Sequence, residues 1–269
     1  MPWTRWLVSA PFFSAIALTA LEPSHVRADE LPSDATVEIA VIGRAKRYQD
    51  RYQLKDALDK RVDNQGEGDE ALYGTRNLRA VIPGALYRGG ANNHYHRSAR
   101  RHNHNPLPGD GLENLCHEGF ETTIYLYSTN FESAERSVSC EARETGDGAR
   151  PNVNSYYQLS PFDGAEHRKT LELVYAALTD GSKGPVYAHC WNGWHASGFL
   201  AATALMQFCG LRPEAAVDYW NAGTDGNLHS QHYDEVRNAI GSFQPYPDLE
   251  ISDELRQALC PDDAGRFAR

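Results

Sequence analysis

The stretch of sequence that decides the fold reads Val186-Tyr187-Ala188-His189-Cys190-Trp191-Asn192-Gly193-Trp194-His195-Ala196-Ser197-Gly198. It follows the chain-breaking pair Gly184-Pro185, and its first three residues are typical of a short buried strand. Residues 196–209 are mostly apolar and predict a helix. The expected order of strand, short loop and helix places Cys190 where the loop begins.

A loop that leads into a helix is a natural site for an anion. The first N–H groups of a helix have no partner within the helix, and the positive end of the helix dipole lies there. The same surroundings favour the thiolate form of a cysteine. Cys190 is therefore expected to be a nucleophile that faces a bound oxyanion.

The segment resembles the active-site loop of the protein tyrosine and dual-specificity phosphatases, His-Cys-x-x-Gly-x-x-Arg-Ser/Thr. His189, Cys190, Gly193 and Ser197 occupy the motif positions. The resemblance implies that Cys190 attacks phosphorus and that the Ser197 hydroxyl helps the thiolate to leave. It also implies that the anion is bound by the backbone amides of the loop residues Trp191, Asn192, Gly193, Trp194, His195 and Ala196.

Weaker similarities to the same family extend over residues 78–242, in the segments 83–90, 112–127, 156–163 and 213–240. Asp163 lies 27 residues before Cys190, where the family keeps its general acid. The resemblance therefore gives Asp163 that role. Asp163-Gly164 is also a strong turn signal, so a purely structural role is the alternative.

The sequence departs from the family at Ala196, which stands where the motif has its arginine. In this family the guanidinium group binds two phosphate oxygens, and a methyl group cannot form such a bidentate pair. Loss of one preorganised oxyanion donor lowers a rate by ~10²–10³. His195 is adjacent and could carry positive charge at low pH. Arg88 is expected to form a structural ion pair. The alternative is that its side chain reaches the active-site pocket.

Strands alternate with helices along residues 78–242. Strands are predicted at 122–127, 156–159 and 186–188 and on either side of Pro83-Gly84, and helices at 111–118, 165–178, 196–209, 213–220 and 231–240. This order predicts an α/β fold with a central, mostly parallel sheet flanked by helices. The resemblance narrows it to the dual-specificity phosphatase fold. Residues 29–77 are expected to be an N-terminal extension with one strand and one helix, and residues 243–269 a C-terminal tail.

Residues 1–28 are expected to be a cleaved signal peptide. Arg5 precedes an apolar run, Leu7 to Leu21, and Val26-Arg27-Ala28 fits the small-x-small cleavage rule. The run is shorter than the roughly 20 residues of a spanning helix, so no membrane anchor is expected after cleavage. An uncleaved N-terminal anchor is the alternative. The protein is accordingly expected in the periplasm or outside the cell.

Charge and cysteine content fit an exported protein. Removal of residues 1–28 changes the formal net charge from −10 to −11, which argues against binding to nucleic acid or an anionic membrane. Cysteines tend to pair in an oxidising compartment, and an odd count of five leaves one free. Cys190 is expected to be the free one. Proximity in the sequence suggests the pairs Cys116–Cys140 and Cys209–Cys260.

A metal site is a further alternative, with no cofactor predicted firmly. The histidines at 94, 96, 102 and 104 cluster in one polar loop, although their spacing matches no standard finger. Zinc or copper could be held by Cys190 and His195 together with loop histidines such as His94 and His96. A simply solvated loop is the competing interpretation.

The sequence thus favours thiolate-based hydrolysis of a phosphate ester at an atypical site. The substrate would be a small molecule or a phosphorylated group. The alternatives are a pseudophosphatase that binds an anion or a partner without turnover, and a Cys/His metal site with different chemistry. Trp191 and Trp194 could form aromatic walls for a flat ligand or pack the loop from behind.

Overall fold

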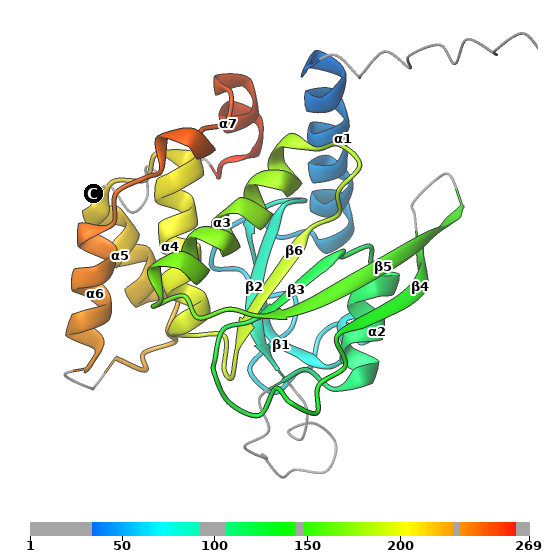
Figure 1. Cartoon of the computed structure of the whole chain (residues 1–269), viewed down its shortest axis with the longest axis horizontal. Helices are drawn as coiled ribbons and strands as arrows, with labels where there is room; N and C mark the ends of the chain where they lie inside the picture. The colour runs from blue at the N-terminus through cyan, green and yellow to red at the C-terminus, as the bar shows by residue number, and fades with distance from the viewer. Residues whose placement is uncertain (1–33, 92–105, 144–147, 229–231, 262–269) are drawn as a thin grey trace, which may run out of the picture. The chain divides into compact units, whose positions relative to one another are not determined.

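The computed structural model describes residues 34–91, 106–143, 148–228 and 232–261, all of which belong to the compact unit Pro32–Arg269. Within these residues the strands form one six-stranded sheet in the order β1-β2-β6-β3-β5-β4 (Figure 1). The strands are β1 (Thr75–Ile82), β2 (Leu86–Ala91), β3 (Thr122–Tyr125), β4 (Ser137–Arg143), β5 (Ala149–Gln158) and β6 (Val186–Cys190). The expected signal peptide lies outside the described residues.

The centre of the sheet is parallel and its edges are antiparallel. Strand β6 pairs in parallel with β2 and β3, and β3 pairs in parallel with β5. Strands β1 and β4 join the two edges through antiparallel pairing. The predicted α/β class with a mostly parallel central sheet is confirmed.

Helices cover both faces of the sheet (Figure 1). They are α1 (Asp34–Tyr52), α2 (Gly109–His117), α3 (Gly164–Thr179), α4 (Ala196–Cys209), α5 (Pro213–Ala222), α6 (His232–Ser242) and α7 (Asp253–Leu259). Neighbouring residues of one strand point to opposite faces, so each strand serves two cores. Ala188 belongs to a core with α3, α4 and α5, whereas Tyr187 belongs to an aromatic core with α2.

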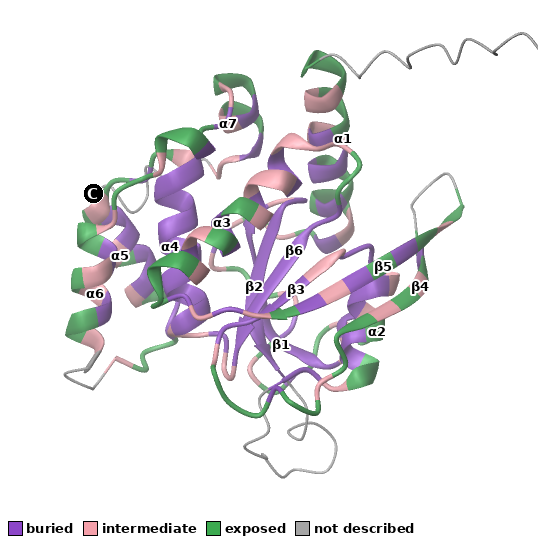
Figure 2. Ribbon diagram, in the orientation of Figure 1, coloured by how far each residue is buried: buried purple, intermediate pink, exposed green. Residues whose placement is uncertain are grey.

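Helix α4 is the most enclosed helix among the described residues. Its residues from Ala196 to Phe208 are all buried, and it contacts β2, β6, α5 and α6 (Figure 2). The left-handed Gly210 (φ 67°) ends it. Because α4 is fixed on all sides, the loop that precedes it has a fixed point of attachment.

Two segments differ from the expectations. The apolar run Val37–Ile42 lies in α1, which buries Val41, Ala45, Tyr48 and Tyr52 at helical spacing, and no strand lies within residues 34–74. The hairpin of β4 and β5 was not expected, except for residues 156–158. Strand β4 is mostly exposed and polar, so its sequence lacks the apolar alternation that indicates a strand.

Both expected disulfides, Cys116–Cys140 and Cys209–Cys260, are present, and Cys190 is free and buried. The first bond joins α2 to β4, and the second joins the end of α4 to the end of α7. Disulfides stabilise mainly by restricting the unfolded chain. The C-terminal segment is thereby held against the fold, and α7 also contacts α1.

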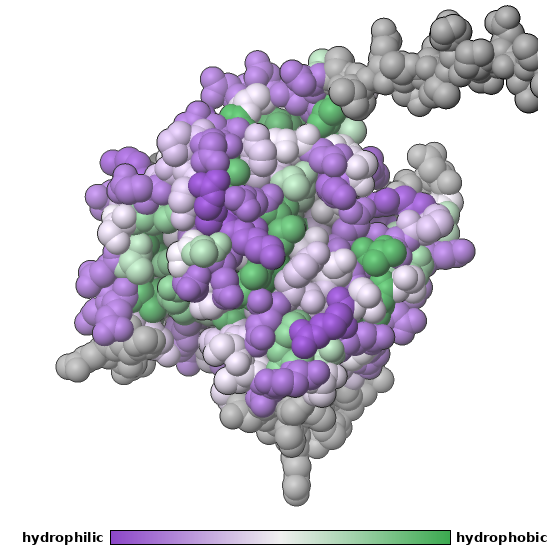
Figure 3. All heavy atoms as spheres, in the orientation of Figure 1, coloured by the Kyte–Doolittle hydropathy of each residue, from purple (hydrophilic) through white to green (hydrophobic). Residues whose placement is uncertain are grey.

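On the face seen in Figure 3, hydrophilic residues predominate and apolar residues occur in small, separate patches. The large apolar side chains exposed within the described residues are Ile39, Val153, Tyr157 and Phe162. None of the described helices is long and apolar enough to cross a membrane.

Candidate active site

Cys190 ends strand β6 at the centre of the sheet. Its neighbour His189 is paired with Gly89 of β2 on one side and with Tyr125 of β3 on the other. The carboxyl ends of parallel strands meet at one edge of a sheet, which is where open α/β folds place their sites. The Cys190 side chain lies at this edge and is only 1% exposed.

Ser197 lies against the cysteine, as the motif implies. The Cys190 sulfur and the Ser197 hydroxyl oxygen are 3.5 Å apart, in hydrogen-bonding contact. Ser197 is fully buried in the first turn of α4. A hydroxyl held in this place can donate to a thiolate and stabilise it.

The carbonyl groups of the loop are all held by donors outside its centre. The Cys190 carbonyl accepts from a His189 ring nitrogen at 3.1 Å, and the His195 carbonyl accepts from the Trp220 indole at 3.1 Å. Donors to the carbonyls of residues 191–194 are the Ala91 amide, the Asn77 side chain and Arg88. These bonds fix the orientation of the loop, and its remaining N–H groups and the first turn of α4 are the candidate anion site.

Gly193 is required by the shape of the loop. Its φ is +75°, a left-handed conformation that glycine adopts without strain. A Cβ atom at this position would lie 2.6 Å from the carbonyl carbon of Gly89. The loop therefore packs directly on the backbone of β2, which fixes its distance from the sheet.

Arg88 supports the loop from behind. It is 1% exposed and donates to the carbonyls of Gly193 (3.0 Å) and Trp194 (3.4 Å). Its guanidinium carbon lies 5.5 Å from the centre of the Tyr219 ring. No carboxylate among the described residues pairs with it, so the expected ion pair is wrong. The cation is held by carbonyl dipoles and an aromatic face instead.

Ala196 opens helix α4 and is buried, with 1% of its surface exposed. Its methyl group belongs to the apolar core. The position that carries a guanidinium group in the resembling phosphatases therefore offers no donor beyond its backbone amide. An anion at the loop would depend on N–H groups and hydroxyls.

Tyr127 is a site residue that the sequence analysis missed. The interaction of its hydroxyl with Cys190, together with burial, raises the pKa of Tyr127 well above its usual value. The phenol therefore stays protonated and can donate to the thiolate. Tyr127 follows β3 directly, and its position after a strand next to that of Cys190 was the signal that could have identified it.

His189 is a positioning residue rather than an acid or base. Burial lowers its pKa to about 4, opposed by its bond to the Cys190 carbonyl. That bond requires the proton on Nδ1, so Nε2 accepts from the Tyr156 hydroxyl at 2.7 Å. The ring also stacks on Tyr187. The neutral imidazole fixes the strand end from which the loop departs.

His195 is engaged at the rim of the site. Its Nε2 donates to the carbonyl of Asn227 at 2.7 Å, and its ring stacks on Tyr233 with centroids 4.1 Å apart. Within the described residues no group of three or more metal-ligating side chains comes together. His94 and His96 lie outside the described residues.

Asp163 caps helix α3. Its Oδ1 accepts from the backbone N–H groups of Ala165 and Glu166, both at 3.0 Å, and the side chain is exposed. The preceding Phe162 packs against Phe199 of α4, with ring centroids 5.0 Å apart. The segment therefore lies beside the helix that carries Ser197, and Asp163 has one oxygen engaged as a cap.

The rim of the loop is joined to the N-terminal part of the chain by Asp225. This carboxylate accepts from the indole of Trp194 at 2.9 Å, from Lys60 at 2.7 Å and from Arg79 at 2.8 Å. Burial opposes its ionisation, but the hydrogen bond from Lys60 and the charge of Arg79 lower the pKa of Asp225 to about 2. Trp194 is thus held at the rim by its polar edge, and Trp191 is partly buried beside it in the loop.

Comparisons with known proteins find similarity among solved structures. No protein-family model matches the chain, and neither does any curated protein. Among solved structures, the chain is similar to the core catalytic domain of the PP-IP phosphatase SIW14 from S. cerevisiae, crystallised with citrate. The two are 13% identical with a TM-score of 0.37, over 72% of this chain and 95% of that domain.

Proposed function

We propose that this protein is a cysteine-dependent hydrolase of phosphate esters that works without a loop arginine. The observation that carries the proposal is the contact of the Cys190 sulfur with Ser197, 3.5 Å away, at the start of the buried helix α4. A thiol in this position faces the N–H groups of a loop whose carbonyls are bound elsewhere. This arrangement supports nucleophilic attack on a bound oxyanion.

The reaction has two steps. The Cys190 thiolate attacks phosphorus, the sulfur–phosphorus bond forms, and the bond to the leaving oxygen breaks as that oxygen takes a proton from a general acid. Water then attacks phosphorus and releases phosphate and the thiolate. Ser197 and Tyr127 both contact the sulfur and would stabilise the departing thiolate. Asp163 is the proposed acid, through the carboxyl oxygen that does not cap α3.

Binding of an anion without turnover is the second candidate, and Ala196 favours it. The buried methyl group supplies no charge where a phosphoryl group would gain negative charge in the transition state. A loop of N–H groups can still bind phosphate in its ground state. A metal-containing site is the remaining alternative, and elemental analysis tests it.

We also propose that the protein works in an oxidising compartment after export. The two disulfides support this, because such bonds persist outside the reducing cytosol. Mass measurement of the protein secreted by its host would test it. A chain that begins at Asp29 is expected, and an intact Met1 in a membrane fraction would refute it.

Turnover of an aryl phosphate by the purified protein and its Cys190→Ser variant tests the hydrolase proposal. The wild-type protein is expected to turn over at a rate at least ~10³-fold above that of the variant. Equal rates in the two proteins would sink the proposal. Phosphate-induced thermal stabilisation without turnover would support the binding candidate. Stoichiometric zinc or copper that is lost in Cys190→Ala would support a metal site.

A further inference from the structure

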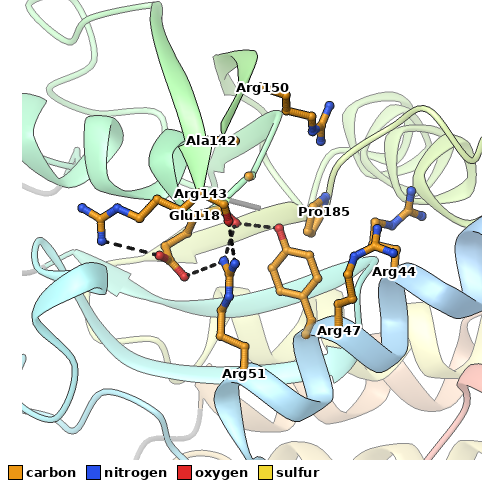
Figure 4. Close-up of a pocket in the computed structure, with 10 residues that line it drawn as sticks. Arg44, Arg47, Arg51, Glu118, Ala142, Arg143, Arg150 and Pro185 are labelled. Atoms are coloured by element: carbon orange, nitrogen blue, oxygen red, sulfur yellow. Dashed lines mark hydrogen bonds and ion pairs between the residues drawn. The ribbon is translucent and has the colours of Figure 1, made fainter. Parts of the chain in front are cut away.

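A concentration of positive charge lies at the opposite edge of the sheet from Cys190. A small open pocket of about 40 Å³ adjoins Gly119, just before β3, and Pro185, just before β6. Its charged lining consists of five arginines and one glutamate (Figure 4). We call this site the arginine pocket. Its arginines are Arg44, Arg47, Arg51, Arg143 and Arg150.

The arginines come from two walls that face each other. Arg44, Arg47 and Arg51 lie three and four residues apart along α1, a spacing that places them on one face of the helix. Arg143 ends β4, and Arg150 lies near the start of β5. Figure 4 shows the side chains of α1 on one side of the pocket and those of the β4–β5 hairpin on the other.

Carboxylates offset only part of this charge. Among the described residues, Glu118 pairs with Arg51 at 3.0 Å and lies 4.0 Å from Arg143, and Glu121 lies 3.6 Å from Arg150. Among the described residues, five guanidinium groups thus meet the carboxylates of Glu118 and Glu121, and the charge of Asp180 also acts on Arg44, in a chain whose formal net charge is −10. The excess positive charge at this place is opposite in sign to that of the protein as a whole.

Two of the arginines are used by the fold. Arg44 is buried and donates to the carbonyls of Gly84, Ala177 and Lys183, which ties α1 to the end of α3. Arg51 donates to the Arg143 carbonyl at 2.6 Å as well as to Glu118. These contacts explain why Arg44 and Arg51 are present, but they leave the other arginines unexplained.

Arg47 and Arg143 have no such structural role. Arg47 is exposed, and no hydrogen bond or ion pair joins its side chain to another described residue. Arg143 has a side chain that is 61% exposed and touches a carboxylate only at 4.0 Å. Guanidinium groups that line one pocket repel one another, which disfavours the cluster unless an anion joins it. The planar fork of a guanidinium group matches phosphate oxygens.

We propose that the arginine pocket binds a phosphate group, either free phosphate or the terminal group of a small phosphorylated molecule. Arg47 and Arg143 bind the oxygens from the two walls, and the buried charge of Arg44 adds attraction. The site is independent of the proposed hydrolase reaction, since it lies at the other edge of the sheet. It would be a second anion site, separate from the loop at Cys190.

The test is a titration of the full-length protein with inorganic phosphate and, separately, with methylphosphonate. The chemical shifts of the backbone amides, measured by NMR, follow the binding. Saturable shifts of the Gly119 and Ala142 amides report the arginine pocket, whereas shifts of Trp194 and Ser197 report the loop. The variants Arg47→Gln and Arg143→Gln should each weaken binding at the pocket about tenfold, which corresponds to 1.4 kcal/mol. The control is Arg212→Gln, which removes the same charge from an exposed arginine elsewhere.

The outcomes separate the two sites. Saturation at Gly119 and Ala142 that is weakened in both pocket variants and unchanged in Arg212→Gln supports the proposal. A response to methylphosphonate as well identifies a terminal phosphate group as sufficient, and a response to phosphate alone identifies the free ion. Shifts that fail to saturate, or equal affinities in all three variants, overturn it. The response of Trp194 and Ser197 bears only on the proposed function.

Discussion

The two edges of the parallel sheet treat positive charge in opposite ways. At the carboxyl edge, Cys190 contacts the Ser197 hydroxyl, and the nearby cation Arg88 is turned to the loop carbonyls. At the amino edge, the arginine pocket gathers five guanidinium groups, with Glu118 and Glu121 as their ion-pair partners among the described residues. Within the part of the chain that the structure describes, the edge with the candidate nucleophile thus directs no guanidinium group at an anion, and the edge with the arginines has no candidate nucleophile. The alanine at the motif position therefore shows where an arginine is missing, but it does not show where the protein concentrates its positive charge.

The largest expected effect comes from placing a cation at the carboxyl edge. Ala196→Arg should raise the rate of aryl phosphate hydrolysis by ~10²–10³, because it restores a charged donor to the transition state. Steady-state kinetics with and without Cys190→Ser in the same chain measure it. Because Ala196 is buried, a melting curve must accompany the assay. A folded, fully phosphate-binding variant with no gain in rate would show that the missing arginine is not what limits the site.

The buried neutral histidines should make the protein sensitive to mild acid. Burial lowers the pKa of His189 and of His167 to about 4, below the usual histidine value of 6.5. Above pH 6.5 both histidines are neutral in the folded and in the unfolded chain. Between 6.5 and 4 the unfolded chain gains protons that the folded chain does not, so stability is lost as pH falls. Each histidine contributes about 3 kcal/mol at most.

Urea unfolding between pH 7 and pH 4.5 measures this effect. His167→Asn should remove roughly half of the pH-dependent loss while leaving the Cys190 loop untouched, since His167 bonds to Thr203 within the helical layer. An unchanged slope in that variant would contradict the assignment. The variants Arg47→Gln and Arg143→Gln leave both histidines in place, so they should keep the wild-type slope.

The Cys190 loop depends strongly on its backbone at Gly193, more than the arginine pocket depends on any of its exposed residues. Gly193→Ala should lower the free energy of unfolding by about 2 kcal/mol or more, because φ is positive and a Cβ would overlap Gly89. Gly241→Ala is the matched control. It lies in α6 with nothing within 4 Å of its Cβ position, and alanine there should stabilise by a few tenths to about 1 kcal/mol. Similar losses in the two variants would mean that the loop is not held as described.

Tyr127→Phe tests how much a neutral hydroxyl stabilises the Cys190 thiolate in place of the missing cation. Removal of a hydrogen bond to a charged group typically costs about 1.5–3 kcal/mol, so alkylation of Cys190 by iodoacetamide at neutral pH should slow by at least about tenfold. Tyr125→Phe is the control, since its hydroxyl lies by Thr129 rather than by the sulfur. Faster alkylation in Tyr127→Phe would instead mean that the ring only shields the thiol.

The smallest expected effect separates the two roles of Asp163. Asparagine caps a helix about as well as aspartate, whereas alanine does not. Asp163→Asn should therefore keep the stability, and Asp163→Ala should lose about 1 kcal/mol in urea unfolding. If Asp163 is the acid, both variants should lose turnover of a substrate with a poor leaving group. Full activity in Asp163→Asn would leave the cap as its one role.

The local patterns allowed much of the fold to be predicted. Alternation of apolar segments with turn residues predicted the strands and helices from β1 to α6 apart from β4 and most of β5, and a count of five cysteines predicted the free thiol. The polar strand β4 could not be predicted, because it is held by pairing with β5 and by the disulfide to α2 rather than by its own apolar residues. For the same reason the burial of α1 against both cores was not apparent from its charged sequence.

By itself the sequence determined the contact of the free thiol with its serine and the shape of the loop, because Cys190, Gly193 and Ser197 lie within eight consecutive residues and short-range geometry joins them. Only the tertiary structure decided which distant groups meet them. It brought Tyr127 to the sulfur from a neighbouring strand, turned Arg88 toward the loop carbonyls, and assembled the arginine pocket from α1, β4 and β5. The reason is physical: a helix or a turn is set by residues three or four apart, whereas contacts between strand ends depend on the order of strands in the sheet, which no local pattern records.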